Sequence, residues 1–142
     1  MKYALALLPL LTGCVLFVGP PVEVPHEEQV TETGVRYLDT LTGTGPPVKS
    51  SDRVTVHYSA RVAGGPPVDS TYDRGTPETF VLDAAPLLGW ADGIPGMRKN
   101  GKRWLSVPPH RAFGDEGVEG VVPPGATLEF EVELIGVERL SK

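Results

Sequence analysis

The chain has 142 residues, 40% of them hydrophobic, which suits one globular domain with a core of its own. Its formal net charge is −5, and it has no basic stripe of the kind that binds nucleic acid, so no nucleic-acid partner is expected. The one basic cluster, from Arg98 to Arg103, brackets the turn pair Asn100-Gly101 and is typical of a solvated hairpin end. The 17 glycines and 15 prolines predict many turns and few long helices.

The first residues have the pattern of an export signal. Met1-Lys2 is followed by an apolar stretch over residues 3–11 and then by Leu11-Thr12-Gly13-Cys14. This order resembles the bacterial lipobox, in which the cysteine after the cleavage point is diacylated. We expect a lipoprotein signal peptide over residues 1–13, lipidation of Cys14 and a place in the cell envelope, anchored to a membrane and facing the periplasm or the exterior. Val15 after the cysteine favours an outer membrane where the cell has one.

Two alternatives for this segment are a transmembrane helix and a free reactive thiol. The apolar run over residues 3–18 is shorter than the ~20 residues that a membrane span needs, and Pro9 interrupts it. Cys14 is the only cysteine, which excludes internal disulfides and cysteine-rich zinc sites. Residues 14–33 lack a sustained period and are expected to be the lipidated N-terminus and a flexible tether.

The folded domain is expected over residues 34–142, with strands as its main elements. Five main strands are predicted over residues 35–41, 53–63, 79–82, 102–107 and from Thr127, with residues 68–71 returning beside the second. Alternation is strictest in the last strand, where glutamates separate four apolar residues, namely Leu128, Phe130, Val132 and Leu134. One short helix over residues 87–94 is stopped by Pro95-Gly96. The class is therefore α+β with an antiparallel sheet.

Residues that carry hydrolytic or metal chemistry are poorly represented. The three histidines, His26, His57 and His110, do not have metal-ligand spacing, so neither a metal nor another cofactor is expected. The sequence has no G-x-S-x-G nucleophile elbow. Asp69-Ser70-Thr71 lacks the second copy that an aspartic-protease dyad needs. These observations favour a function that depends on shape and a few dipoles.

A series of short motifs in a fixed order resembles a known family. The motifs are Val54-Thr55-Val56-His57-Tyr58, Asp69-Ser70-Thr71, Gly89-Trp90, Val107-Pro108-Pro109, Ala112-Phe113-Gly114 and the run over residues 121–134. Together they resemble the FKBP-type peptidyl-prolyl cis-trans isomerases, here in a bacterial lipoprotein form. The resemblance implies a five-stranded antiparallel sheet wrapped around one short helix, with an apolar pocket between them.

The resemblance also implies roles for individual residues. Tyr58, Asp69, Trp90 and Phe113 match catalytic positions, with the tryptophan as the floor under a substrate proline ring. The loop over residues 108–125 would be a flap over the site. The substrate-binding positions are Val68, Arg74, Phe80, Leu87, Val121, Val122 and Phe130, with Arg74 orienting Asp69. Core packing alone would also explain the apolar members of this set, and a surface turn would explain Asp69.

The function implied is acceleration of X-Pro isomerisation during the folding of exported proteins. The alternative is a weakly active or inactive FKBP-like envelope lipoprotein that binds proteins as a chaperone module. The expected partners are proline-containing polypeptides, macrolide inhibitors of the rapamycin class and a membrane reached through the lipid on Cys14, and we expect a monomer.

Three positions depart from the family pattern. Active members usually have phenylalanine where Val68 and Glu78 stand, and tyrosine where Phe113 stands. The segment over residues 82–88 also looks one residue shorter than usual, with Pro86 at a contact position. A lost neutral hydrogen bond to substrate is worth about 1 kcal/mol, so these changes predict a weakened site on an unchanged fold.

Overall fold

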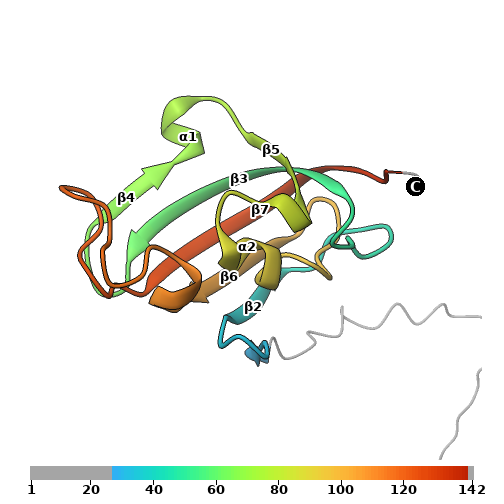
Figure 1. The fold of residues 1–142 in the computed structure, drawn as a ribbon. Coiled ribbons are helices and arrows are strands. Elements are labelled where there is room, and N and C mark those ends of the chain that lie inside the picture. Colours follow the sequence, from blue (N-terminus) through green and yellow to red (C-terminus); the bar gives the residue numbers. More distant parts are fainter. Residues whose placement is uncertain (1–26, 141–142) are drawn as a thin grey trace, which may run out of the picture.

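The structure is a computed structural model, and it describes residues 27–140 of the chain. Its centre is a seven-stranded antiparallel sheet in the order β1-β2-β6-β7-β3-β4, with β5 also paired to β3 (Figure 1). The strands are β1 (Gln29–Val30), β2 (Arg36–Leu41), β3 (Arg53–Val62), β4 (Pro67–Ser70), β5 (Glu78–Val81), β6 (Lys102–Val107) and β7 (Leu128–Glu138).

The strand β3 organises the sheet. One edge of β3 pairs with β7 along its whole length, and β4 and β5 pair in turn with the other edge. The helix α1 (Thr71–Arg74) interrupts that edge position between β4 and β5 (Figure 1). Because β4 and β5 share one position beside β3, the sheet has the five expected strand positions. The two-residue β1 is an additional strand at its far edge. The α+β class and the antiparallel sheet predicted from the sequence are confirmed.

Two local predictions need correction. Gln29 and Val30 pair with β2, so the end of the segment expected to be a tether belongs to the sheet. The helix α1 was not predicted, although Ser70 caps its start by accepting from the Asp73 N–H at 3.4 Å. Gly75 ends it in the left-handed conformation at φ 72°. The predicted signal peptide over residues 1–13 and the lipidation of Cys14 lie outside the described residues.

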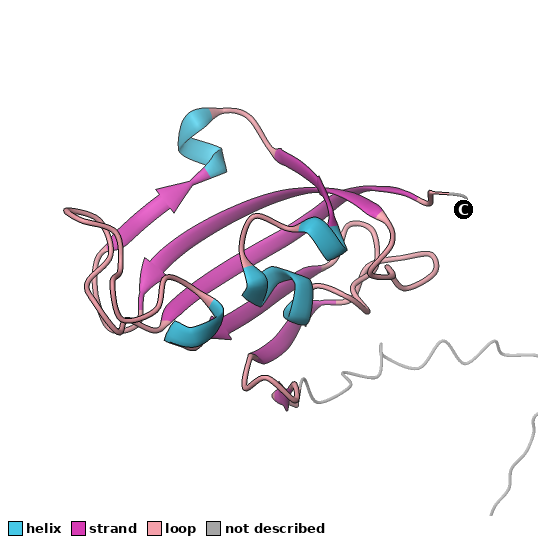
Figure 2. Ribbon diagram, in the orientation of Figure 1, coloured by secondary structure: helices cyan, strands magenta, loops and turns pink. Residues whose placement is uncertain are grey.

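The short helix α2 (Leu88–Gly93) lies across one face of the sheet, as predicted (Figure 2). It approaches the sheet closely at Gly89, where an added Cβ would come within 2.4 Å of a Val107 methyl carbon. Two 3₁₀ turns, η1 (Leu82–Ala84) and η2 (Pro109–Arg111), complete the helical elements of the described chain. None of the helices in this part of the chain is long and apolar enough to cross a membrane.

The hydrophobic core lies between α2 and the sheet. The alternating apolar residues of the central strands are buried, as their period predicted, while the β7 glutamates lie on the opposite face. Trp104 also lies on that outer face, where it is half-buried with the Arg36 guanidinium 6.0 Å from its ring centroid. The buried sheet residues include Val54, Val56, Tyr58, Ala60, Leu105, Val107, Leu128, Phe130, Val132 and Leu134.

Candidate functional site

An apolar cavity of about 450 Å³ opens between α2, the strands β3 and β4, and the loop that joins β6 to β7. That loop, orange in Figure 1, gathers at the end of the sheet where β4 begins. The cavity is lined by Tyr58, Ala60, Val68, Asp69, Glu78, Pro86, Leu87, Trp90, Phe113, Val118, Val121, Val122, Leu128 and Phe130. Its size and its lining of apolar groups with a few polar ones are typical of a small-molecule or peptide site.

An aromatic cluster forms the inner end of the cavity. Trp90, on α2, is 4% exposed and meets Tyr58 and Phe130 edge to face, with ring centroids 4.8 and 5.5 Å apart. Phe80 stacks on Trp90 at 5.4 Å. Rings held in such contacts at these distances are fixed in position beyond what burial alone gives. The indole N–H of Trp90 is buried and has no hydrogen-bond partner among the described residues.

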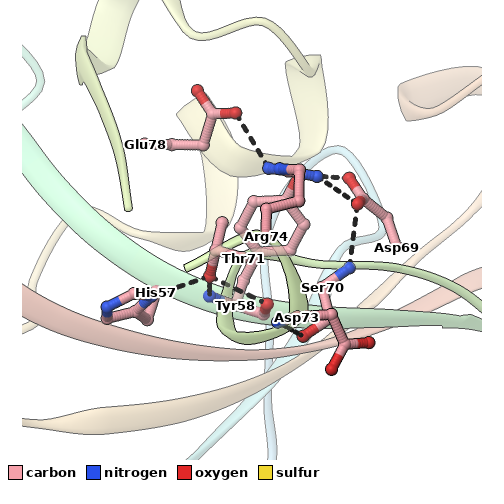
Figure 3. A network of polar contacts seen from close by, with 8 residues as sticks. All are labelled: His57, Tyr58, Asp69, Ser70, Thr71, Asp73, Arg74 and Glu78. Carbon is pink, nitrogen blue, oxygen red and sulfur yellow. Dashed lines mark hydrogen bonds and ion pairs between the residues drawn. The ribbon is translucent and has the colours of Figure 1, made fainter. Parts of the chain in front are cut away.

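A polar wall stands at one side of this aromatic cluster. The Tyr58 hydroxyl donates to Asp69 Oδ2 at 2.5 Å, and the Ser70 N–H donates to Asp69 Oδ1 at 2.8 Å. The Arg74 guanidinium donates to the same Oδ1 and, at 3.1 Å, to Glu78 Oε1 (Figure 3). Both oxygens of Asp69 are therefore held, which fixes this carboxylate at the edge of an apolar cavity.

These contacts shift the ionisation of the wall residues. Burial alone would raise the pKa of Asp69, but the hydrogen bonds from Tyr58, Arg74 and the Ser70 N–H outweigh it, and the pKa is lowered. Burial and the neighbouring Asp69 carboxylate raise the pKa of Tyr58 above its usual value. The hydrogen bonds with Tyr58 and Asp69 raise the pKa of Arg74 above its usual value. At neutral pH the wall thus holds a charged carboxylate, a charged guanidinium and a neutral phenol.

Thr71 positions this wall from behind. Its buried hydroxyl accepts from the Tyr58 N–H at 2.8 Å and lies 3.2 Å from the Tyr58 carbonyl oxygen, to which it donates. The His57 Nδ1 lies 2.9 Å from the same hydroxyl (Figure 3). The His57 ring also stacks on Tyr72, with ring centroids 4.7 Å apart. The start of α1 is therefore bonded to the stretch of β3 that carries Tyr58.

The loop over residues 108–125 closes the opposite side of the cavity, as the flap expected from the sequence would. Val118 and Val122 form an isolated β-bridge, and the Gly117 N–H donates to the Phe113 carbonyl at 3.0 Å. Val122 is 5% exposed, whereas Phe113 and Val121 are 42% and 51% exposed. The loop is thus bonded to itself and offers apolar side chains at the mouth of the cavity.

Most residues predicted from the sequence meet in this cavity. Those that line it are Tyr58, Val68, Asp69, Leu87, Trp90, Phe113, Val121, Val122 and Phe130. Arg74 and Phe80 do not line it in this structure: Arg74 holds Asp69, and Phe80 stacks behind Trp90. The functional roles expected for these eleven residues stay predictions.

Five lining residues were not predicted as site residues. Glu78 and Pro86 were noted only as departures from the family pattern. Ala60 and Leu128 share the inward faces of Tyr58 and Phe130, so the period of their strands could have indicated them. Val118 lies in an irregular loop, where no periodic signal exists.

Within residues 27–140 no group of histidine, acidic or cysteine side chains is arranged to hold a metal ion.

Comparison with known proteins gives the family of the chain. The family model described as FKBP-type peptidyl-prolyl cis-trans isomerase matches residues 45–135. With this match and the relatives below, the chain belongs to the FKBP-type peptidyl-prolyl cis-trans isomerase family, as its motifs predicted.

Among its relatives is the FKBP-type peptidyl-prolyl cis-trans isomerase FkpA of Escherichia coli strain K12, to which the chain is 39% identical over 114 residues. That match covers 80% of this chain and 42% of FkpA, so the chain spans less than half the length of this relative. The FK506-binding protein of Neisseria meningitidis serogroup B is 40% identical over 105 residues, covering 73% of this chain and 96% of that protein.

Solved structures of FKBP proteins support the same fold and family. The crystal structure of FkpA from Escherichia coli has a TM-score of 0.72 at 38% identity, and the match covers 79% of this chain and 52% of that one. The crystal structure of AtFKBP13 has a TM-score of 0.71 at 34% identity, covering 79% of this chain and 99% of that one. The predicted FKBP-like fold is confirmed.

Proposed function

We propose that this protein is a peptidyl-prolyl cis-trans isomerase that accelerates X-Pro isomerisation while exported proteins fold. The observation that carries the proposal is the apolar cavity with Trp90 at its inner end and the Tyr58–Asp69 pair on its wall. Membership of an enzyme family with this activity supports it. Uncatalysed X-Pro isomerisation takes tens to hundreds of seconds, slow enough to limit folding.

The cavity suits this reaction because the reaction needs no nucleophile, proton relay or metal. The barrier of about 20 kcal/mol arises from amide resonance, which is lost when the C–N bond rotates. The twisted amide has less charge separation than the planar one, so a dry apolar cavity favours it. A thousandfold acceleration requires only about 4 kcal/mol of preferential stabilisation of the twisted state.

Different residues bind the proline ring, place a charge beside the amide and exclude water. We propose that the proline ring lies on Trp90 between Tyr58 and Phe130, so that the ring is held while the preceding carbonyl rotates. The Asp69 carboxylate, fixed by the hydrogen bonds from Tyr58 and the Ser70 N–H, supplies a negative charge at a fixed place beside the rotating amide. The flap residues Val121 and Val122 exclude water from the same space.

The test is cis–trans exchange of an Ala-Leu-Pro-Phe peptide, followed by NMR with the purified protein at micromolar concentration. The exchange rate is expected to exceed the rate in buffer, which is seen as line broadening or as exchange peaks. Folded protein that gives no acceleration would overturn the proposal. A second readout is a denatured protein whose refolding waits for a proline isomerisation, which the enzyme should shorten.

The rival function is that of a binding module that keeps the fold without useful catalysis. Val68, Glu78 and Phe113 all line the cavity, and each replaces a residue usual in active members. The family relatives favour the isomerase. The double variant Phe113→Tyr with Glu78→Phe distinguishes the two, because activity that appears only in the variant would define the natural protein as a binder.

The site also suggests a ligand class. Relatives from Neisseria and Neurospora are named FK506-binding proteins. We propose that the same cavity binds macrolides of the rapamycin class, with the thinner wall at Val68 weakening the contact. Competition between such a macrolide and the Leu-Pro peptide tests this.

We further propose that the protein is a monomeric lipoprotein of the cell envelope, anchored through Cys14. The support is the order Leu11-Thr12-Gly13-Cys14 after a basic start and an apolar stretch. Cells fed a labelled fatty acid should label the wild-type protein and leave Cys14→Ser unlabelled. Equal labelling of both would contradict lipidation at this position.

A further inference from the structure

The cavity wall contains a carboxylate that the proposed isomerisation does not use. Glu78, on β5, lines the cavity, and its side chain is 43% exposed. Its Oε1 accepts from Arg74 at 3.1 Å, and Arg74 also binds Asp69 (Figure 3). One guanidinium is therefore shared between two carboxylates, so this side of the cavity mouth keeps one uncompensated negative charge.

The flap carries further carboxylates next to the cavity. Asp115, Glu116 and Glu119 are exposed, and none forms an ion pair within the described chain. Glu116 and Glu119 line a hollow of about 500 Å³ on the flap. Val118 and Val121 line both this hollow and the main cavity, so the two spaces adjoin across these side chains.

The cations at this end of the domain are engaged elsewhere. Arg111, which precedes the acidic stretch, donates to both carboxylate oxygens of Asp92 at 2.6 and 3.0 Å. Arg74 is held between Asp69 and Glu78. A peptide entering the cavity thus meets apolar surface in the centre, the net negative group of Asp69, Arg74 and Glu78 on the wall, and carboxylates without an ion pair on the adjoining flap.

We propose that these carboxylates select proline-containing segments with lysine or arginine beside the proline, with Glu78 and the flap pair Glu116 and Glu119 as the determinants. The inference rests on the proposed function, because it concerns which substrates the same cavity takes. Each exposed ion pair contributes little alone, but several carboxylates of one sign around a partly dry cavity, on a chain of net charge −5, act together.

The experiment compares peptides that differ only beside the proline, with Lys, Gln or Glu before it in one set and after it in another. The expected order of kcat/KM in at least one set is Lys, Gln, Glu, with about tenfold between the extremes at an ionic strength of about 20 mM. The ratio should approach one at about 1 M salt, where the Debye length is about 3 Å.

Variants show which carboxylates act. The Lys-to-Glu ratio of kcat/KM should fall several-fold in Glu78→Gln and in the double variant Glu116→Gln with Glu119→Gln. Glu131→Gln removes an exposed carboxylate from the outer face of the sheet and is the matched control, expected to keep the wild-type ratio.

Two results overturn the inference in different ways. If all peptides are accelerated equally, or if Glu131→Gln lowers the ratio as much as Glu78→Gln and the double variant do, the carboxylates do not select substrates, although the proposed isomerase activity stands. If no peptide is accelerated by the folded protein, the proposed function fails and the inference fails with it.

Discussion

The hydroxyl of Tyr58 reaches Asp69 diagonally across two strands. Asp69 on β4 is in register with Ala60 on β3, yet its carboxylate accepts from Tyr58, two residues further along the same face, at 2.5 Å. Diagonal neighbours on one face of an antiparallel pair lie within reach of a long side chain. The register of a single strand pair therefore brings the two polar groups of the cavity wall together.

Removing this hydroxyl should weaken catalysis more than folding. Tyr58→Phe keeps the ring against Trp90 but removes a hydrogen bond worth about 1 kcal/mol, so kcat/KM for a Leu-Pro peptide should fall roughly three- to tenfold. Tyr72→Phe is the matched control, because Tyr72 donates to Glu133 on the outer face of the sheet. It should leave kcat/KM as in the wild type, and equal losses in both variants would contradict a role for Tyr58 in the cavity.

The Thr71 hydroxyl should be a major local source of stability. Thr71→Val keeps the shape but leaves the buried Tyr58 N–H without its acceptor, which should lower the free energy of unfolding by about 1 to 3 kcal/mol. Thr71→Ser retains the hydroxyl and should lose much less. Urea unfolding followed by tryptophan fluorescence measures both, and equal midpoints for the two variants would show that the hydroxyl is not needed.

The lowered pKa of Asp69 predicts a loss of stability in acid. Burial opposes ionisation, but the hydrogen bonds from Tyr58 and Arg74 prevail, so the folded state binds its proton more weakly than the unfolded chain does. The stabilisation is complete above the unfolded pKa of about 3.9 and disappears as the pH falls through the lower folded value. Asp69→Asn should therefore lose less stability than the wild type below about pH 4.

Asp52 also loses its stabilising effect in acid. This buried carboxylate has a lowered pKa because Arg139 and the Lys49 N–H donate to it, so some acid sensitivity should persist in Asp69→Asn. Unfolding free energies measured from about pH 6 to about pH 2 separate the two contributions. Parallel curves for the wild type and Asp69→Asn would contradict the assignment to Asp69.

Adding a hydroxyl at the cavity mouth should raise kcat/KM. Phe113 lines the cavity and is 42% exposed, so Phe113→Tyr has room for the added oxygen. A new hydrogen bond to a substrate carbonyl of about 1 kcal/mol would raise kcat/KM about fivefold. Steady-state kinetics on the Leu-Pro peptide measure this, and an unchanged or lower value would show that Phe113 does not face the substrate.

The sequence predicted those parts of the molecule whose signal is periodic or local. The alternation in β3 and β7 identified the inward face that carries Tyr58 and Phe130, because strand side chains point to opposite faces in turn. The helix α2 was indicated by the stop at Pro95-Gly96.

The remaining features depend on how the chain turns back on itself and have no periodic signal. The strand β1 exists through its pairing with β2, where Arg36 also binds Glu28. Arg74 and Glu78 are only four residues apart, but α1 ends at Arg74, so their pairing depends on the turn from α1 into β5 and not on helical spacing. Val118 reaches the cavity through an irregular loop held by its own hydrogen bonds. The positions of β1, of the Arg74–Glu78 pair and of Val118 could therefore be determined only from the folded structure.

The most direct test compares the two tryptophans. NMR exchange of an Ala-Leu-Pro-Phe peptide should be accelerated by the wild type and by Trp104→Phe, since Trp104 lies on the outer face of the sheet. It should be clearly slower with Trp90→Phe, which thins the inner end of the cavity while retaining a ring. No acceleration by the folded wild type, or equal acceleration by both variants, would contradict catalysis in this cavity.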